Sequence, residues 1–173
     1  LQTMTRRSLF AGLIALALLP PGAPAQTIDG KAAFEKLKGL AGTWSNSDSR
    51  TAGDSGQIRY EVISGSSVVM EVPSPGAPHE MRSMYHLDKG DLVMTHYCSG
   101  GTQPHLRLSK TASTSSKLVF DFAGGTNLDV AKDAHVHEGE ILFLNDGKIE
   151  ANWTAWAGGK PAGSNRFAVS REK

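Results

Sequence analysis

The chain has 173 residues, with 18 Lys and Arg against 17 Asp and Glu, and a single cysteine, Cys98. A chain of this length corresponds to one domain with a sizeable core. One cysteine excludes an internal disulfide. No basic stretch is interleaved with aromatic residues, so we expect no nucleic-acid partner.

The first 25 residues are predicted to be a signal peptide. Arg6 and Arg7 precede an apolar run at 9–19, and Ala23 and Ala25 supply the small residues that a signal peptidase requires. Residues 5–10 resemble a twin-arginine export motif, which leaves Sec and twin-arginine export open. No cysteine follows the apolar run. We therefore expect a periplasmic or secreted protein, with no stable membrane anchor after cleavage and a single domain at 26–173.

The mature chain is predicted to begin with a short helix. Asp29 is a suitable N-cap, and Phe34 and Leu37 recur at a spacing of three residues. Gly39 and Gly42 mark its end.

From Trp44 onward, period-2 segments alternate with turn residues, which is typical of an all-β domain. Strands are expected near 42–48, 57–63, 67–73, 80–87, 92–98, 105–110, 117–122, 135–144, 148–156 and 164–171. Their short spacing predicts an up-and-down antiparallel β-barrel of about 8–10 strands with a short N-terminal helix.

The connections differ between the two ends of this barrel. One end is predicted to carry tight turns, and the other the longer segments 49–56, 73–78, 99–104, 123–134 and 157–163, which are rich in Gly and Pro. Long loops on one rim are typical of an open, ligand-facing mouth. Five histidines flank these long connections and one flanks a tight turn: His79, His96, His105, His135 and His137 at the mouth, and His86 at the floor.

Residues 37–44, with Gly42 and Trp44 in a Gly-x-Trp motif, resemble the first strand of the calycins. The segments 78–81, 85–88, 95–98, 103–104 and 134–137 resemble a bacterial family of exported, uncharacterised lipocalin-like domains. That resemblance implies a lipocalin-like barrel without an established activity. It also implies that a late basic residue covers Trp44, for which Arg171 is the candidate. Gly139 stands where the family pattern has an apolar residue.

The histidines supply the chemistry of a candidate site. His135 and His137 lie two apart on one strand, so we expect them to project from one face, about 6.8 Å apart along it. His96 and Cys98 share a face of the strand at 92–98 and end at the same mouth. Two imidazoles can hold one metal where a third ligand converges. His96, His135 and His137 are therefore candidate ligands for zinc or haem.

Three functions stay open. The first is binding of a small-molecule ligand at a rim site lined by His96, His135, His137, Cys98 and Tyr85. The second is a metal- or haem-binding protein, with or without enzymatic activity, that uses the three histidines as ligands. The third is an accessory or interaction domain whose barrel is filled by side chains and whose histidines only bond neighbouring polar groups. No nucleophile elbow or phosphate loop is present, so no catalytic residue is assigned.

Overall fold

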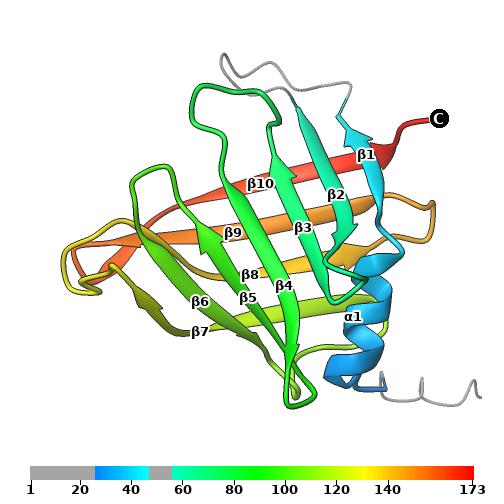
Figure 1. Cartoon of the computed structure of the whole chain (residues 1–173), viewed down its shortest axis with the longest axis horizontal. Helices are drawn as coiled ribbons and strands as arrows, with labels where there is room; N and C mark the ends of the chain where they lie inside the picture. Colours follow the sequence, from blue (N-terminus) through cyan, green and yellow to red (C-terminus); the bar gives the residue numbers. More distant parts are fainter. Residues whose placement is uncertain (1–25, 47–55) are drawn as a thin grey trace, which may run out of the picture.

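A computed structural model describes residues 26–46 and 56–173 of the chain. These residues form one short helix and a closed antiparallel barrel of ten strands (Figure 1). Each strand pairs with its neighbours in sequence, and the first pairs with the last, so the barrel has no open edge. The prediction of an all-β, up-and-down barrel is confirmed. No helix within the described residues has the length and apolar character needed to cross a membrane.

The elements follow one another without crossovers. They are α1 (Gly30–Lys38), β1 (Gly42–Ser45), β2 (Gln57–Ile63), β3 (Val68–Pro73), β4 (Arg82–Asp88), β5 (Asp91–Tyr97), β6 (Gln103–Leu108), β7 (Lys117–Thr126), β8 (His135–Phe143), β9 (Ile149–Ala157) and β10 (Lys160–Arg171).

Two predicted loops are in fact partly strand. Strand β7 continues to Thr126, and β10 begins at Lys160, so the expected long connections at 123–134 and 157–163 are shorter than predicted. Gly158 and Gly159 have φ values of 60° and 71°. Two successive positive φ values are what a tight two-residue hairpin turn requires. The glycines of this segment therefore make a tight turn rather than a long loop.

The helix closes the floor of the barrel. Its N-terminus is capped as predicted, since Asp29 Oδ1 accepts a hydrogen bond from Ala32 N at 2.8 Å. Phe34 and Leu37 are buried in the barrel core. A Cβ atom at Gly30 would lie 2.3 Å from a backbone oxygen of the β4–β5 turn, so the helix backbone packs directly on that turn. Figure 1 shows α1 beside the β2–β3 turn, at the end opposite the β3–β4 and β5–β6 loops.

Arg171 joins the last strand to the first. Its guanidinium carbon lies 4.5 Å from the ring centroid of Trp44. Its two terminal nitrogens donate to Ala41 O at 2.5 Å and to Gly39 O at 2.6 Å. The indole N–H of Trp44 donates to Leu40 O at 2.8 Å. The expectation that a late basic residue covers Trp44 is therefore confirmed, and these contacts hold the helix–strand junction on the closed barrel.

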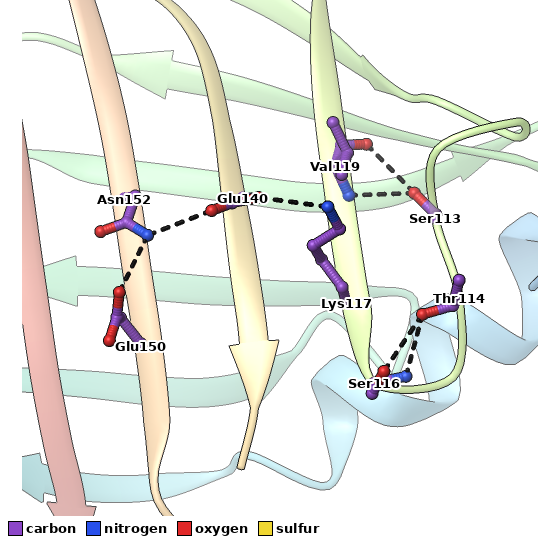
Figure 2. Close-up of polar contacts among 8 residues, drawn as sticks. All are labelled: Ser113, Thr114, Ser116, Lys117, Val119, Glu140, Glu150 and Asn152. Atoms are coloured by element: carbon purple, nitrogen blue, oxygen red, sulfur yellow. Dashed lines mark hydrogen bonds and ion pairs between the residues drawn. The ribbon is translucent and has the colours of Figure 1, made fainter. Parts of the chain in front are cut away.

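The outer face of β7, β8 and β9 is polar. Asn152 Nδ2 donates to Glu140 and to Glu150 at 3.2 Å each, and Lys117 Nζ lies 3.6 Å from Glu140 (Figure 2). These pairs face solvent, where each contributes about 0–1 kcal/mol. They lie on the outer surface of the barrel, opposite the face that lines its interior.

The β6–β7 connection is held by its own polar side chains. The buried Ser113 Oγ accepts a hydrogen bond from Val119 N at 2.9 Å and lies 3.3 Å from Val119 O (Figure 2). Ser116 N donates to Thr114 Oγ1 at 3.3 Å. These bonds satisfy backbone groups of the turn and fix the floor next to α1.

The long connections share the opposite end, which we call the mouth. Thr102 Oγ1 in the β5–β6 loop donates to Ala134 O in the β7–β8 loop at 3.3 Å, and Asn127 Nδ2 donates to Gly101 O at 2.6 Å. The β9–β10 turn also donates a backbone hydrogen bond to the β7–β8 loop. The predicted shared mouth is confirmed for these loops. Most of the predicted loop at 49–56 lies outside the described residues.

Candidate functional site

A cavity of about 200 Å³ opens inside the barrel at the mouth. Its lining is mostly apolar, with a few polar groups: Pro73, Met81, Met94, Ala134, Val136, Trp153, Ala155 and Phe167, and the polar Glu71, Ser83, His96, Cys98, His135 and Asn165. A cavity of about 150 Å³ holds benzene, whereas drug-sized ligands occupy about 300–1,000 Å³. The cavity therefore fits a molecule the size of a single ring.

A row of polar residues crosses four strands on the inner face of the barrel, and three of these residues line the cavity. In the strand register Tyr60 lies opposite Glu71, Glu71 opposite Ser83, and Ser83 opposite His96. Residues directly opposite one another share a face of the sheet, about 4.5–5.5 Å apart. The register thus places the carboxyl, the hydroxyls and the imidazole at one level of the barrel.

Among the described residues that line the cavity, His96 has a buried ring nitrogen without a hydrogen-bond partner. It is 5% exposed, and its Nδ1 lies 3.0 Å from Ser83 Oγ. Its Nε2 is buried and has no hydrogen-bond partner among the described residues. Burial lowers the pKa of His96 from 6.5 to about 4, so the ring is neutral at pH 7. A buried polar atom left unpaired costs about 1–3 kcal/mol, and a ligand that bonds Nε2 removes that cost.

Glu71 is a buried carboxyl at the same level. It is 2% exposed, and its Oε2 accepts a hydrogen bond from Tyr85 Oη at 2.5 Å. Burial raises the pKa of Glu71 from 4.5 to about 7, and the Tyr85 hydroxyl opposes this rise. The Tyr60 hydroxyl lies near the same carboxyl without a hydrogen bond of good geometry. Glu71 is therefore held by the Tyr85 hydroxyl rather than by a cation.

His135 and His137 contact each other, but only His135 lines the cavity. His135 Nδ1 lies 2.9 Å from Asp133 O, and its Nε2 lies 3.0 Å from His137 Nδ1. The His137 ring is stacked on Phe122 and on Trp156, with centroids 4.4 Å and 3.8 Å away. The Phe122 and Trp156 rings are each nearly parallel to the His137 ring, and both cannot stack on the same face of it at these distances. His137 therefore lies between them. His137 is thus held in an aromatic stack beside the cavity.

A β-bulge explains why the two histidines differ. The register of β8 against β9 shifts between Val136 and Glu138, which leaves His137 as the extra residue. A bulge breaks the two-residue alternation of a strand and redirects its side chains. The expectation that His135 and His137 project alike into one site therefore does not describe the structure. Burial and the neighbouring His135 both lower the pKa of His137.

The other predicted site residues occupy different positions. Cys98 is half-buried and lines the cavity, where its Sγ accepts a hydrogen bond from Gly100 N at 3.4 Å. Tyr85 is fully buried and is absent from the cavity lining, so it acts on the cavity through Glu71. His105 alternates with the buried Pro104 and Leu106 in β6, as expected for the outer face.

The arrangement does not fit the predicted metal ligands. Among residues 26–46 and 56–173, no three or more His, Cys, Asp or Glu side chains are grouped so that they could hold a metal ion. Both ring nitrogens of His135 already lie within hydrogen-bond distance of Asp133 O and His137. A haem macrocycle is larger than drug-sized ligands and does not fit a cavity of about 200 Å³.

Glu71, Ser83 and Asn165 line the cavity, and the sequence-based site did not include them. Glu71 alternates with Val69 on β3, and this two-residue parity was the available signal that its side chain faces inward. Ser83 and Asn165 carried no comparable signal, because small polar residues are common on both faces of a strand.

Comparisons with known proteins add no relative to this description. No protein-family model matches the chain, and none of the curated proteins is similar to it in sequence. The chemistry of the site must therefore be derived from the cavity. It combines an apolar lining, a neutral imidazole with an unused nitrogen, and a buried carboxyl without a cation.

Proposed function

We propose that this chain is an exported, lipocalin-like barrel that binds a small molecule. The ligand is mainly apolar and about the size of a single ring, and it occupies the cavity at the mouth. One of its polar groups forms a hydrogen bond with His96 Nε2. The dimensions and the lining of the cavity support this size and polarity.

One observation carries the proposal. His96 Nε2 is buried, unpartnered among the described residues, and belongs to a side chain that lines the cavity. Buried polar groups are bonded in the great majority of cases, so an unbonded one beside a cavity indicates a missing partner. An interaction domain with a filled barrel would be expected to pack this space and to satisfy the imidazole internally. Ligand binding therefore accounts for the site better than the filled-barrel alternative.

The affinity expected for a small probe is modest. Small ligands gain between about 0.3 and 1.5 kcal/mol per non-hydrogen atom. At about 0.5–0.7 kcal/mol per atom, in the lower half of that range, the roughly eight non-hydrogen atoms of benzyl alcohol correspond to a Kd of about 0.1–1 mM. Binding of this strength is saturable and measurable by NMR titration.

The test is an NMR titration of the mature protein with benzyl alcohol, benzylamine and benzoate. At least one probe is expected to bind saturably and to shift resonances of Met94, Trp153 and Ala155. Ala155→Phe fills the cavity and is expected to abolish these shifts, while Thr154→Phe, which changes the adjacent outer-face residue, leaves them. Saturable binding that survives Ala155→Phe, or no binding by any probe, contradicts the proposed function.

A further inference from the structure

The described lining of the cavity carries an acidic group without a basic one to neutralise it. The lining contains the carboxyl of Glu71 but no Lys or Arg among the described residues. The imidazole of His96 is neutral at pH 7 because burial lowers its pKa. The other imidazole of the lining, His135, has both ring nitrogens within hydrogen-bond distance of Asp133 O and His137 Nδ1. The described lining therefore contains no Lys or Arg, and no free imidazole nitrogen of His135, to pair with a carboxylate in the cavity.

The inner faces of the described strands next to Glu71 supply no cation either, because Arg59 on β2 and Arg82 on β4 form ion pairs with Glu61 and Glu80 away from the cavity. From β2 the nearest inward group is the hydroxyl of Tyr60, and from β4 the hydroxyls of Ser83 and Tyr85 face the same level. From β5 the inward group is the neutral ring of His96. Buried ionised groups in proteins are paired or coordinate a cation, because an isolated buried charge is strongly disfavoured. Glu71 is thus a buried acid whose partner is not provided by the described chain.

We propose that the ligand is a small amine, whose protonated nitrogen pairs with the Glu71 carboxylate while its apolar body occupies the rest of the cavity. This inference rests on the proposed function and specifies the ligand class for the same site. Trp153 and Phe167 belong to the lining, and aromatic faces attract cations. An anionic ligand would meet the carboxylate with no compensating cation. A neutral ligand would leave the carboxylate unpaired.

The pairing makes binding dependent on pH. Burial raises the pKa of Glu71 to about 7, so the carboxyl is largely protonated at pH 5 and largely ionised at pH 8. A protonated amine binds the ionised form more tightly. The affinity is therefore expected to increase from pH 5 to pH 8, and binding near pH 7 is expected to release a proton from Glu71. His96 stays neutral over this range and does not contribute to the change.

Three probes of nearly the same shape show how the charge of the ligand affects its affinity. Benzylamine is cationic, benzyl alcohol is neutral and benzoate is anionic at pH 7.5. Because charge-assisted hydrogen bonds are roughly twice as strong as neutral ones, benzylamine is expected to bind about tenfold more tightly than benzyl alcohol. Benzoate is expected to bind most weakly. The measurement is the Kd of each probe by NMR or calorimetric titration of the mature protein.

Two variants locate the effect. Glu71→Gln preserves the shape of the side chain and is expected to weaken benzylamine about tenfold, to the level of benzyl alcohol. Glu61→Gln makes the same chemical change on the outer face of β2, where Glu61 pairs with Arg59, and is expected to leave all three affinities unchanged. If Glu71→Gln does not fold, the parent protein supplies the test through the tenfold increase in benzylamine affinity from pH 5 to pH 8.

The outcomes separate the two proposals. Benzyl alcohol or benzoate binding as tightly as benzylamine overturns the amine inference and leaves small-molecule binding standing. A benzylamine affinity that is insensitive to Glu71→Gln, or to pH in the parent protein, also overturns the amine inference. Failure of all three probes to bind overturns the proposed function and the amine inference together.

Discussion

Replacing Glu71 or His96 by glutamine is expected to reveal two opposite pH dependences of stability that cancel in the parent protein. The folded-state pKa of Glu71 is about 7, above its ordinary value of 4.5. The folded-state pKa of His96 is about 4, below its ordinary value of 6.5. Both shifts arise from burial of groups that line one cavity.

The signs follow from proton linkage. Between pH 4.5 and pH 7 the carboxyl of Glu71 stays protonated in the folded protein but ionises in the unfolded chain. The contribution of Glu71 to the free energy of unfolding therefore falls as the pH rises from 4.5 to 7. Between pH 6.5 and pH 4 His96 gains a proton in the unfolded chain but stays neutral in the folded protein. The contribution of His96 to the free energy of unfolding therefore falls as the pH drops from 6.5 to 4. Each pKa difference is about 2.5, which at about 1.36 kcal/mol per pKa unit corresponds to about 3 kcal/mol.

The assay is urea unfolding of the parent, Glu71→Gln and His96→Gln proteins between pH 4 and pH 8. Relative to the parent, Glu71→Gln is expected to gain about 3 kcal/mol in free energy of unfolding from pH 4.5 to pH 7. His96→Gln is expected to gain about the same from pH 6.5 down to pH 4. With a denaturant slope near 2 kcal/mol/M, each gain moves the urea midpoint by about 1.5 M.

The comparison with the parent removes the contributions of all other titrating groups. The double variant Glu71→Gln/His96→Gln is expected to give a nearly flat difference curve at about 3 kcal/mol, because one gain rises with pH while the other falls. Single-variant difference curves that do not change with pH would refute the reasoning, because they would mean that burial shifts neither pKa.

Other predictions concern packing, barrel closure and export. Gly139→Ala is expected to lower the free energy of unfolding by about 1–3 kcal/mol, because its Cβ would lie 2.1 Å from the Trp153 ring. The control is Gly100→Ala, whose Cβ would meet nothing closer than 3.7 Å. Equal Tm values for the two variants would contradict this prediction. Arg171→Met is expected to lower the free energy of unfolding in urea by about 1–3 kcal/mol, because it removes two hydrogen bonds and the cation above the Trp44 ring. An unchanged urea midpoint would show that these contacts do not stabilise the barrel. N-terminal sequencing of the periplasmic protein is expected to begin at or near Gln26, and an uncleaved cytoplasmic protein would contradict export.

The strands could be predicted because most of them bury alternate residues. In β2, Ile58 and Tyr60 are buried between half-buried neighbours, and β5 and β6 alternate in the same way. The first half of β10 does not, since every residue from Lys160 to Arg166 is exposed. A strand without a buried face carries no period-2 signal, so its first residues resembled a loop.

The site was predicted in part for the same reason. His96 and Cys98 line the cavity because parity along a regular strand is readable from sequence. The bulge at His137 shifts the alternation of β8, so that Val136 lies opposite the cavity-lining Ala155 and His137 does not line the cavity. Such a bulge depends on pairing with β9, which no local pattern reveals. The parity of Glu71 with Val69 along β3 indicated an inward side chain, but its place opposite Ser83 depends on the register between β3 and β4, which the sequence does not show.

A crystal structure of the mature protein with benzylamine tests the central claim most directly. We expect electron density for the probe within the mouth cavity, against Met94 and Trp153, with its polar atom about 3 Å from His96 Nε2 or from Glu71. Density for the probe outside the barrel would contradict the account. So would a cavity filled by side chains, with His96 Nε2 bonded to another protein group.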